Sequence, residues 1–198
     1  MTIAATFAYP VFLDLHEVPV LVVGAGPVAA RKVSGLAAAG AAVRVVAPEI
    51  GIDLDRREVA ELHQRPYEPG DLDGVRLVVT ATGRTDIDAA VAADATAAGI
   101  WVNAADQPGD CTFILPAIAR NGPLTVAVST DGASPALARR LRDRAATLLT
   151  DDAVTLAEQL ATRRAAVRAT GGSTEDVEWS ALIDPVVPPP ETNSHPPR

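Results

Sequence analysis

Hydrophobic and polar residues follow a block pattern along the first hundred residues of the chain. Four largely apolar runs predict strands near 18–23, 42–47, 75–81 and 100–104, and the first should be buried on both faces because no polar residue interrupts Val20 to Val23. Alanine-rich patterns near 27–39 and 85–98 predict helices, and a weaker pattern near 53–63 predicts another helical segment. Strands that alternate with helices are typical of βαβ crossovers. We therefore expect an α/β fold in which a parallel sheet carries helices on both faces.

The pattern changes after about residue 110. Short strands are expected at 112–118 and 124–130, separated by the turn "RNGP". Ser134-Pro135 is a helix start, with serine as N-cap and proline at the first helical position, and this helix should run to about Leu149. Another helix is expected from Asp151 to about Arg168. These elements predict a small α+β segment followed by a helical segment.

The stretch "VPVLVVGAGPVAARKV" joins the first strand to the first helix. Gly24 permits a tight turn, and Gly26 has no Cβ to obstruct a close ligand. Ala29 takes the third small position, where the helix lies against the strand. The N–H groups that open this helix carry partial positive charge and suit a pyrophosphate. This G-x-G-x-x-G/A arrangement predicts a Rossmann-like dinucleotide-binding fold.

The end of the second strand bears on the choice of cofactor. Ala47-Pro48 stands at its tip, Glu49 follows, and no arginine or lysine is placed there to meet a 2′-phosphate. NAD is therefore favoured over NADP, and Glu49 is either a partner of a ribose hydroxyl or an ordinary surface glutamate. Thr80 lies at the carboxyl edge of the sheet and is either a cofactor contact or part of a polar turn.

Composition and charge narrow the picture. The single cysteine, Cys111, excludes an intramolecular disulfide, and the N-terminus lacks a basic leader, so we expect a soluble cytoplasmic protein without membrane association. The net charge of −8 argues against nucleic-acid binding. Residues 114–170 nevertheless hold eight arginines and five acids. This segment is expected to meet an anionic ligand, the alternative being a solvated helix face.

Three stretches resemble one enzyme family in their order. They are "YPVFLDLHEVPVLVVGAGPVAARKVSGLAAAGAAVRVVAPEI", "VVTATGRTDIDAAV" and "VNAADQPGDCTFILPAIARNGPLTVAVSTDGASPALARRLRDR". Together they are similar to the precorrin-2 dehydrogenases, which form sirohydrochlorin in sirohaem biosynthesis and also occur as the front part of multifunctional sirohaem synthases. The resemblance covers roughly residues 7–150.

The resemblance implies an activity and an assembly. Family members use NAD⁺ to oxidise precorrin-2, a tetrapyrrole, and some also insert Fe²⁺ as ferrochelatases. They are homodimers whose interface here corresponds to about 114–150. The cofactor-binding residues expected from the motif and the resemblance are Gly24, Gly26, Pro27, Val28, Ala29, Pro48, Glu49, Thr80 and Asn103.

The important aspartate of the family corresponds to Asp106, just past the strand 100–104. Dehydrogenation removes a hydride and a proton, and a carboxylate at this edge can take the proton. The alternative is a turn former, because Asp-Gln-Pro-Gly is favourable turn chemistry. Arginines bind the carboxylate arms of a tetrapyrrole well. The expected substrate contacts are Arg120, Ser129, Thr130, Arg139 and Arg142, whereas Arg140 should point to Asp143 or to solvent.

Two other functions remain open, and so does metal binding. A nucleotide-sensing regulatory module would explain the glycine turn without catalysis, and a dehydrogenase of another polycarboxylate would share the fold. The histidines and Cys111 show no metal-ligand spacing, so no metal site is expected. The expected organisation is 1–113 for the dinucleotide-binding domain, 114–150 for dimerisation and substrate, 151–170 for a helical extension, and 171–198 for a disordered tail rich in proline.

Overall fold

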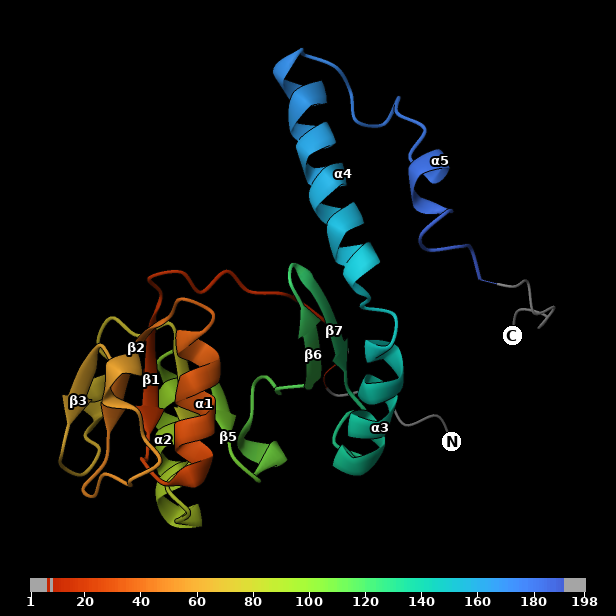
Figure 1. Cartoon of the computed structure of the whole chain (residues 1–198). Helices are drawn as coiled ribbons and strands as arrows, with labels where there is room; N and C mark the ends of the chain where they lie inside the picture. The colour runs from red at the N-terminus through yellow and green to blue at the C-terminus, as the bar shows by residue number, and fades with distance from the viewer. Residues whose placement is uncertain (1–6, 8, 191–198) are drawn as a thin grey trace. The chain divides into compact units, whose positions relative to one another are not determined.

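The computed structural model describes residue 7 and residues 9–190. The chain divides into two compact units, which we call unit 1 (up to Leu115) and unit 2 (from Pro116 onward). Figure 1 shows the elements of each unit. The predicted organisation into four segments stays a prediction, and residues 191–198 of the predicted tail lie outside the described residues.

Unit 1 is built on a five-stranded parallel sheet with the order β3-β2-β1-β4-β5 (Figure 1). Its strands are β1 (Pro19–Val23), β2 (Ala42–Val46), β3 (Glu61–His63), β4 (Leu77–Thr80) and β5 (Trp101–Ala104). At the carboxyl edge, Val23 pairs with Val46 on one side and with Thr80 on the other. The predicted Rossmann-like parallel sheet is confirmed.

Two helices supply the packing on the sheet, α1 (Pro27–Ala37) and α2 (Thr85–Ala97). Successive side chains of a strand point to opposite faces, so β1 contributes to two separate cores. Val20 and Val22 pack in the cluster that contains Val33 of α1, whereas Leu21 and Val23 pack in the cluster that contains Val91 of α2. The helices therefore cover both faces of the sheet, as the alternation of the sequence predicts.

The segment near 53–63 is not the expected helical segment. It holds a short 3₁₀ helix, η1 (Arg56–Glu58), followed by the edge strand β3. Asp55 accepts a hydrogen bond from the N–H of Arg57 and begins the 3₁₀ turn. The pairing of β3 with β2 then outweighs the weak local helical pattern, because the free edge of β2 needs partners for its backbone groups.

The strand expected at 112–118 begins later, as β6 (Ala117–Asn121), and pairs antiparallel with β7 (Leu124–Val128). Two features explain the difference. The N–H of Thr112 donates to the carbonyl of Val102 at 2.9 Å, so this part of the segment is bound to β5. Pro116 has no N–H for a ladder, so pairing with β7 starts after it.

Unit 2 combines the β6–β7 hairpin with α3 (Pro135–Ala146), α4 (Asp151–Ala169) and the short α5 (Ser180–Ile183). The hydroxyls of Ser134 and Thr150 accept hydrogen bonds from the first turns of α3 and α4, at 3.2 Å each. Helix α3 packs on both strands of the hairpin. The side chain of Asn121 joins β6 to the start of α4 by donating to the carbonyl of Leu149 and to Asp151.

The remaining short elements are the 3₁₀ helices η2 (Pro69–Leu72) and η3 (Pro108–Asp110). Across residue 7 and residues 9–190, no helix is both long and apolar enough to cross a bilayer.

Candidate functional site

A cleft of about 200 Å³ opens at the carboxyl edge of unit 1, above strands β1, β4 and β5. Three loops surround it: the β1–α1 turn, the β4–α2 turn and the turn that follows β5. Its lining consists of Gly26, Pro27, Val28, Ala81, Thr82, Gly83, Asp88, Ala105 and Asp106. The structure thus brings together Asp106 and three of the residues expected to bind the cofactor.

The glycine turn at the start of the cleft cannot accept a side chain at its first position. Gly24 has a φ of +109°, and a Cβ there would overlap the carbonyl of Ala81. A Cβ on Gly26, in contrast, would meet nothing within 4 Å. The first glycine is therefore required by packing, and the second leaves open space at the mouth of the cleft for a ligand.

The N-terminus of α1 faces this space without a side-chain cap. Gly26 is the N-cap residue, Pro27 follows at the first turn, and that turn carries no acidic residue. The free N–H groups and the helix dipole favour a bound anion at this position. Ala29 is fully buried and lets α1 lie close to β1. These residues fit the pyrophosphate of a dinucleotide.

Thr80, Thr82 and Asp88 form a hydrogen-bonded group in the wall of the cleft. Asp88 is 3% exposed and Thr80 is completely buried. The hydroxyl of Thr80 donates to Oδ1 of Asp88. The N–H of Thr82 also donates to this oxygen at 3.1 Å, and the hydroxyl of Thr82 lies 2.9 Å from it. The hydroxyl of Thr80 is thus engaged inside the protein, and its predicted contact with the cofactor stays a prediction.

Asp106 lies on the turn after β5 and is exposed to the cleft. Its φ of +60° is a left-handed conformation that aspartate tolerates better than most residues. The thiol of Cys111 holds this turn: it accepts from the N–H of Ala104 at 3.2 Å and lies 3.3 Å from the carbonyls of Ala104 and Gln107. Burial raises the pKa of Cys111, so the thiol keeps its proton and can donate. Asp106 is therefore part of a stable turn and at the same time exposes its carboxylate to the cleft.

Lys32 is a charged neighbour that sequence reasoning missed. It is half-buried on α1, and burial lowers its pKa, although the charge of Asp106 acts in the opposite direction. Lys32 is the only lysine of the chain, and this was the signal in the sequence that could have drawn attention to it.

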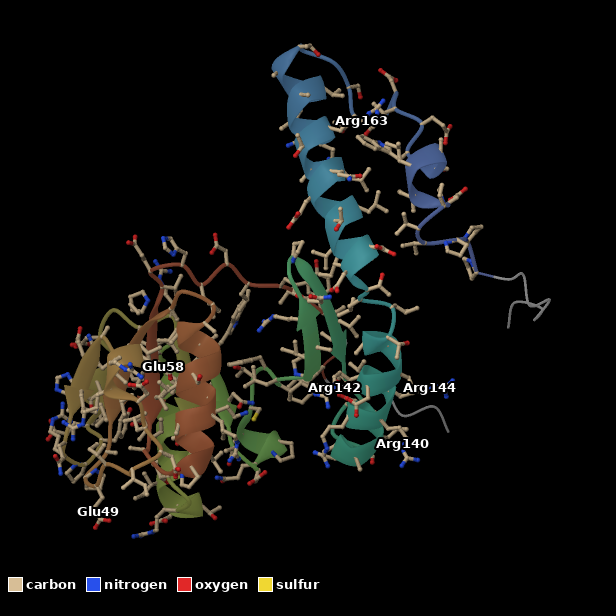
Figure 2. The ribbon with its side chains drawn as sticks, in the orientation of Figure 1. Glu49, Glu58, Arg140, Arg142, Arg144 and Arg163 are labelled. Atoms are coloured by element: carbon tan, nitrogen blue, oxygen red, sulfur yellow. The ribbon has the colours of Figure 1, made fainter. Side chains whose placement is uncertain are left out.

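Three other predicted cofactor contacts lie outside the cleft lining. Pro48 and Glu49 follow β2 and are exposed (Figure 2 labels Glu49), and the side chain of Gln64 approaches the carbonyl of Pro48 at 3.5 Å. Asn103 is 6% exposed, and its amide donates to the carbonyl of Phe113 at 3.1 Å. Their roles toward a cofactor stay predictions.

The expected substrate residues belong to unit 2. Arg120 and Arg139 are exposed. Arg142 (labelled in Figure 2) is already engaged, because it pairs with Asp143 at 2.7 Å and also donates to the carbonyl of Ile118 in β6. Arg142 rather than Arg140 is therefore the partner of Asp143, and Arg140 is exposed.

The loop before α3 is closed by its own hydrogen bonds. The hydroxyl of Thr130 accepts from the N–H of Ser134 and lies 3.1 Å from its carbonyl, while the hydroxyl of Ser129 accepts from the N–H of Asp131. Contacts of these residues with a substrate stay predictions. Among the described residues, no group of three or more His, Cys, Asp or Glu side chains is arranged to hold a metal ion.

Comparisons with known proteins agree with this geometry. Residues 11–117 match the family described as "Putative NAD(P)-binding", and residues 121–144 match the family described as "Sirohaem biosynthesis protein central". The chain is 42% identical to a sirohaem synthase of Methylobacillus flagellatus over 184 residues, which is 90% of this chain and 39% of that protein. It is 44% identical to a sirohaem synthase of Methylococcus capsulatus over 162 residues, or 80% of this chain and 34% of that protein.

A solved structure is similar over nearly the whole chain. It is titled "SirC, precorrin-2 dehydrogenase", with a TM-score of 0.65, 27% sequence identity, and coverage of 90% of this chain and 87% of that one. The chain spans about two fifths or less of the sirohaem synthases cited above. The first family match covers more than half of the chain, including the glycine turn and Asp106. Together with the second family match and the relatives named above, it confirms the resemblance found in the sequence. The chain belongs to this NAD(P)-binding family, in which the dinucleotide-binding region is followed here by the central region of sirohaem biosynthesis proteins.

Proposed function

We propose that this chain oxidises precorrin-2 to sirohydrochlorin with NAD⁺ in the formation of sirohaem. The observation that carries the proposal is the common cleft, in which the uncapped N-terminus of α1 and the carboxylate of Asp106 lie on opposite sides of the β4–α2 turn. The relatives named above, a precorrin-2 dehydrogenase and two sirohaem synthases, support it. A nucleotide sensor would need no carboxylate at the position of Asp106.

NAD⁺, when bound, supplies the acceptor of a hydride. The chain provides the rest. The β1–α1 turn binds the pyrophosphate through the N–H groups of α1 and so fixes the direction of the dinucleotide along the sheet edge. Asp106 accepts the proton that leaves the substrate.

The size of the cleft indicates where the substrate lies. At about 200 Å³ it is smaller than usual sites for ligands of drug size, so a macrocycle must extend beyond it. Guanidinium groups bind the carboxylate arms of such a macrocycle well, and the sequence predicts them among residues 114–150. Arg120 and Arg139 make no ion pair with any described residue and are the better candidates. Arg142 contributes less, since Asp143 already pairs with it.

We further propose that the chain acts as a homodimer in the cytoplasm, without nucleic-acid or membrane partners. Unit 2 leaves apolar side chains of α3 exposed, including Leu137 and Leu141, as expected for an interface. A net charge of −8 disfavours nucleic acid. A half-buried free thiol at Cys111, used only for hydrogen bonds, suits a reducing compartment.

The test is the variant Asp106→Asn, with Asp110→Asn as matched control. Both residues are exposed acids of the same turn region, but Asp110 does not line the cleft. Sirohydrochlorin formation from precorrin-2 and NAD⁺ is followed anaerobically by absorbance. Asp106→Asn should lower kcat by about 10²- to 10⁴-fold, the usual contribution of a positioned general base.

Calorimetric titration completes the test. The Kd for NAD⁺ should stay within about twofold in both variants, because neither carboxylate carries the pyrophosphate. Normal turnover by Asp106→Asn would exclude the catalytic role. A wild-type chain that binds NAD⁺ but ignores precorrin-2 would favour the sensor.

A further inference from the structure

The two carboxylate oxygens of Asp88 have different surroundings. All hydrogen bonds that Asp88 receives from protein groups end on Oδ1, from Thr80 and Thr82. No described residue donates to Oδ2. Every completely buried side-chain oxygen of the described residues has a partner, so Oδ2 is not enclosed. Asp88 lines the cleft, and this is the space that Oδ2 can reach.

The carboxylate also lacks a neutralising cation. Arg84, the arginine nearest in sequence, pairs with Asp86 at 2.8 Å instead. A carboxylate that is 97% buried and holds an unpaired oxygen is costly to keep unless a donor completes it. The hydrogen bonds of Oδ1 are explained by its role in stabilising the β4–α2 turn. This role gives no reason for an acceptor at the position of Oδ2.

The position of Asp88 along the sheet edge identifies the donor. Strand β4 lies between β1 and β5, so Asp88 lies between the N-terminus of α1 and Asp106. In a dinucleotide, a ribose joins the pyrophosphate to the redox ring. If the pyrophosphate lies at α1 and the ring lies near Asp106, this ribose lies over the end of β4. That ribose carries two hydroxyl donors and no charge. A phosphate at the same place would be repelled by the carboxylate.

We propose that Asp88 is a cofactor-binding residue whose Oδ2 accepts a hydrogen bond from the ribose next to the redox ring, while Thr80 and Thr82 orient the carboxylate through Oδ1. This inference rests on the proposed use of a dinucleotide cofactor. It assigns Thr80 a positioning role and adds to the site a residue that neither the glycine motif nor the family resemblance had indicated.

The variant Asp88→Asn separates the two oxygens. The N–H of Thr82 can only donate, so the amide oxygen of the asparagine must take the place of Oδ1. The amide nitrogen then faces the cleft in place of Oδ2, so that a hydrogen-bond donor replaces an acceptor there. The size of the side chain and its hydrogen bonds with Thr80 and Thr82 are kept. The matched control is Asp86→Asn, an exposed acid of the same helical turn that does not line the cleft.

The experiment compares three ligands by titration calorimetry: NAD⁺, ADP-ribose and ADP. Only the first two contain the second ribose. In Asp88→Asn the Kd values for NAD⁺ and ADP-ribose should rise about ten- to a hundredfold, as expected when a hydrogen bond to a charged group is lost. The Kd for ADP should change less than about twofold, and Asp86→Asn should leave all three values unchanged.

Three results would overturn the inference, and they are distinguishable. Unchanged binding of NAD⁺ and ADP-ribose by Asp88→Asn would show that Oδ2 binds no ribose. Equal weakening of all three ligands, or a large fall in Tm, would assign Asp88 to folding of the cleft. A wild-type chain that binds neither NAD⁺ nor ADP would overturn the proposed function, and this inference with it.

Discussion

The two units of the molecule bury their side chains very differently. In unit 1, the middle residues of β1, Val20 to Val22, are completely inaccessible, and two clusters of apolar side chains fill both faces of the sheet. In unit 2, only three apolar residues are buried among the described residues: Ala138, Ala153 and Leu156. Leucines of α3 and of the residues that follow it are instead exposed: Leu137 by 49%, Leu141 by 42% and Leu148 by 70%.

We interpret this difference as that between a scaffold, unit 1, and the proposed contact surface of unit 2. Unit 1 has a core of its own and places the cleft without help from other chains. Unit 2 has regular helices with good caps but few buried apolar side chains among the described residues, which agrees with the proposed interface on α3. Three predictions test this contrast, from the largest expected change in the free energy of unfolding to the smallest.

The largest effect is expected for Gly24→Ala, because a Cβ at this φ of +109° would overlap the backbone of Ala81. We expect a loss of about 3 kcal/mol, or a fall in Tm of roughly 6–12 °C. Gly26→Ala is the matched control, since its Cβ meets nothing within 4 Å. It should keep Tm within about 2 °C and weaken NAD⁺ binding at least tenfold, because the methyl group occupies the ligand's space.

Scanning calorimetry and NAD⁺ titration distinguish these outcomes. If Gly24→Ala unfolded at the wild-type temperature, the tight strand–turn–helix packing described above would be wrong. If Gly26→Ala bound NAD⁺ normally, the pyrophosphate would not lie at this turn.

A smaller effect is expected for Asp71→Asn, which removes a charged anchor of unit 1. Asp71 is 5% exposed, and Arg65 donates to it at 2.6 Å and 2.9 Å. Burial alone would raise the pKa of Asp71, but Arg65 and the N–H of Glu68 lower it below its ordinary value. At pH 7 the variant should lose about 2 kcal/mol.

The pH dependence follows from the direction of that shift. A carboxyl whose pKa is lower in the folded state stabilises the fold above its unfolded pKa of about 3.9. This contribution is lost as the pH falls through the lower folded value. The difference in unfolding free energy between wild type and variant should therefore shrink below about pH 4 in urea titrations. A constant difference down to pH 2.5 would contradict the ion pair as its source.

The smallest effect on the free energy of unfolding is expected for Leu141→Glu. The same variant should have the clearest effect on dimer formation. The side chain is exposed on α3, so the free energy of unfolding of unit 1 should change by less than about 0.5 kcal/mol. A charge in an apolar interface should shift the chain from dimer to monomer in sedimentation equilibrium. Ala136→Glu, at a small exposed position of the same helix, is the control. A wild-type monomer would refute the proposed interface.

The sequence predicted the strands β1, β2, β4 and β5 well because each lies in a largely apolar run. It missed β3, because an edge strand with Glu61 and His63 has no such run and depends on its pairing with β2. It placed β6 too early, because Phe113 packs against the core of unit 1 instead of extending the hairpin.

The site was predicted in part for similar reasons. The glycine turn has a local motif and Asp106 was indicated by the family resemblance, so the sequence could propose both, and the structure places Asp106 and Gly26 in one cleft. Asp88 and Lys32 lie inside helices, where charged residues are usually solvated. Only the spacing of Asp88, three and four residues before the buried Val91 and Ala92, indicated that this acid faces the core.

The strand order has a consequence for how such proteins change over time. Because β1 lies between β2 and β4, the connections from β1 and β4 depart toward opposite ends of the sheet, and a notch is left between them whatever side chains are present. Chain routing alone therefore creates the recess. Mutations in the three surrounding loops can therefore alter which molecule binds or reacts there, while the strands that stabilise the fold stay unchanged.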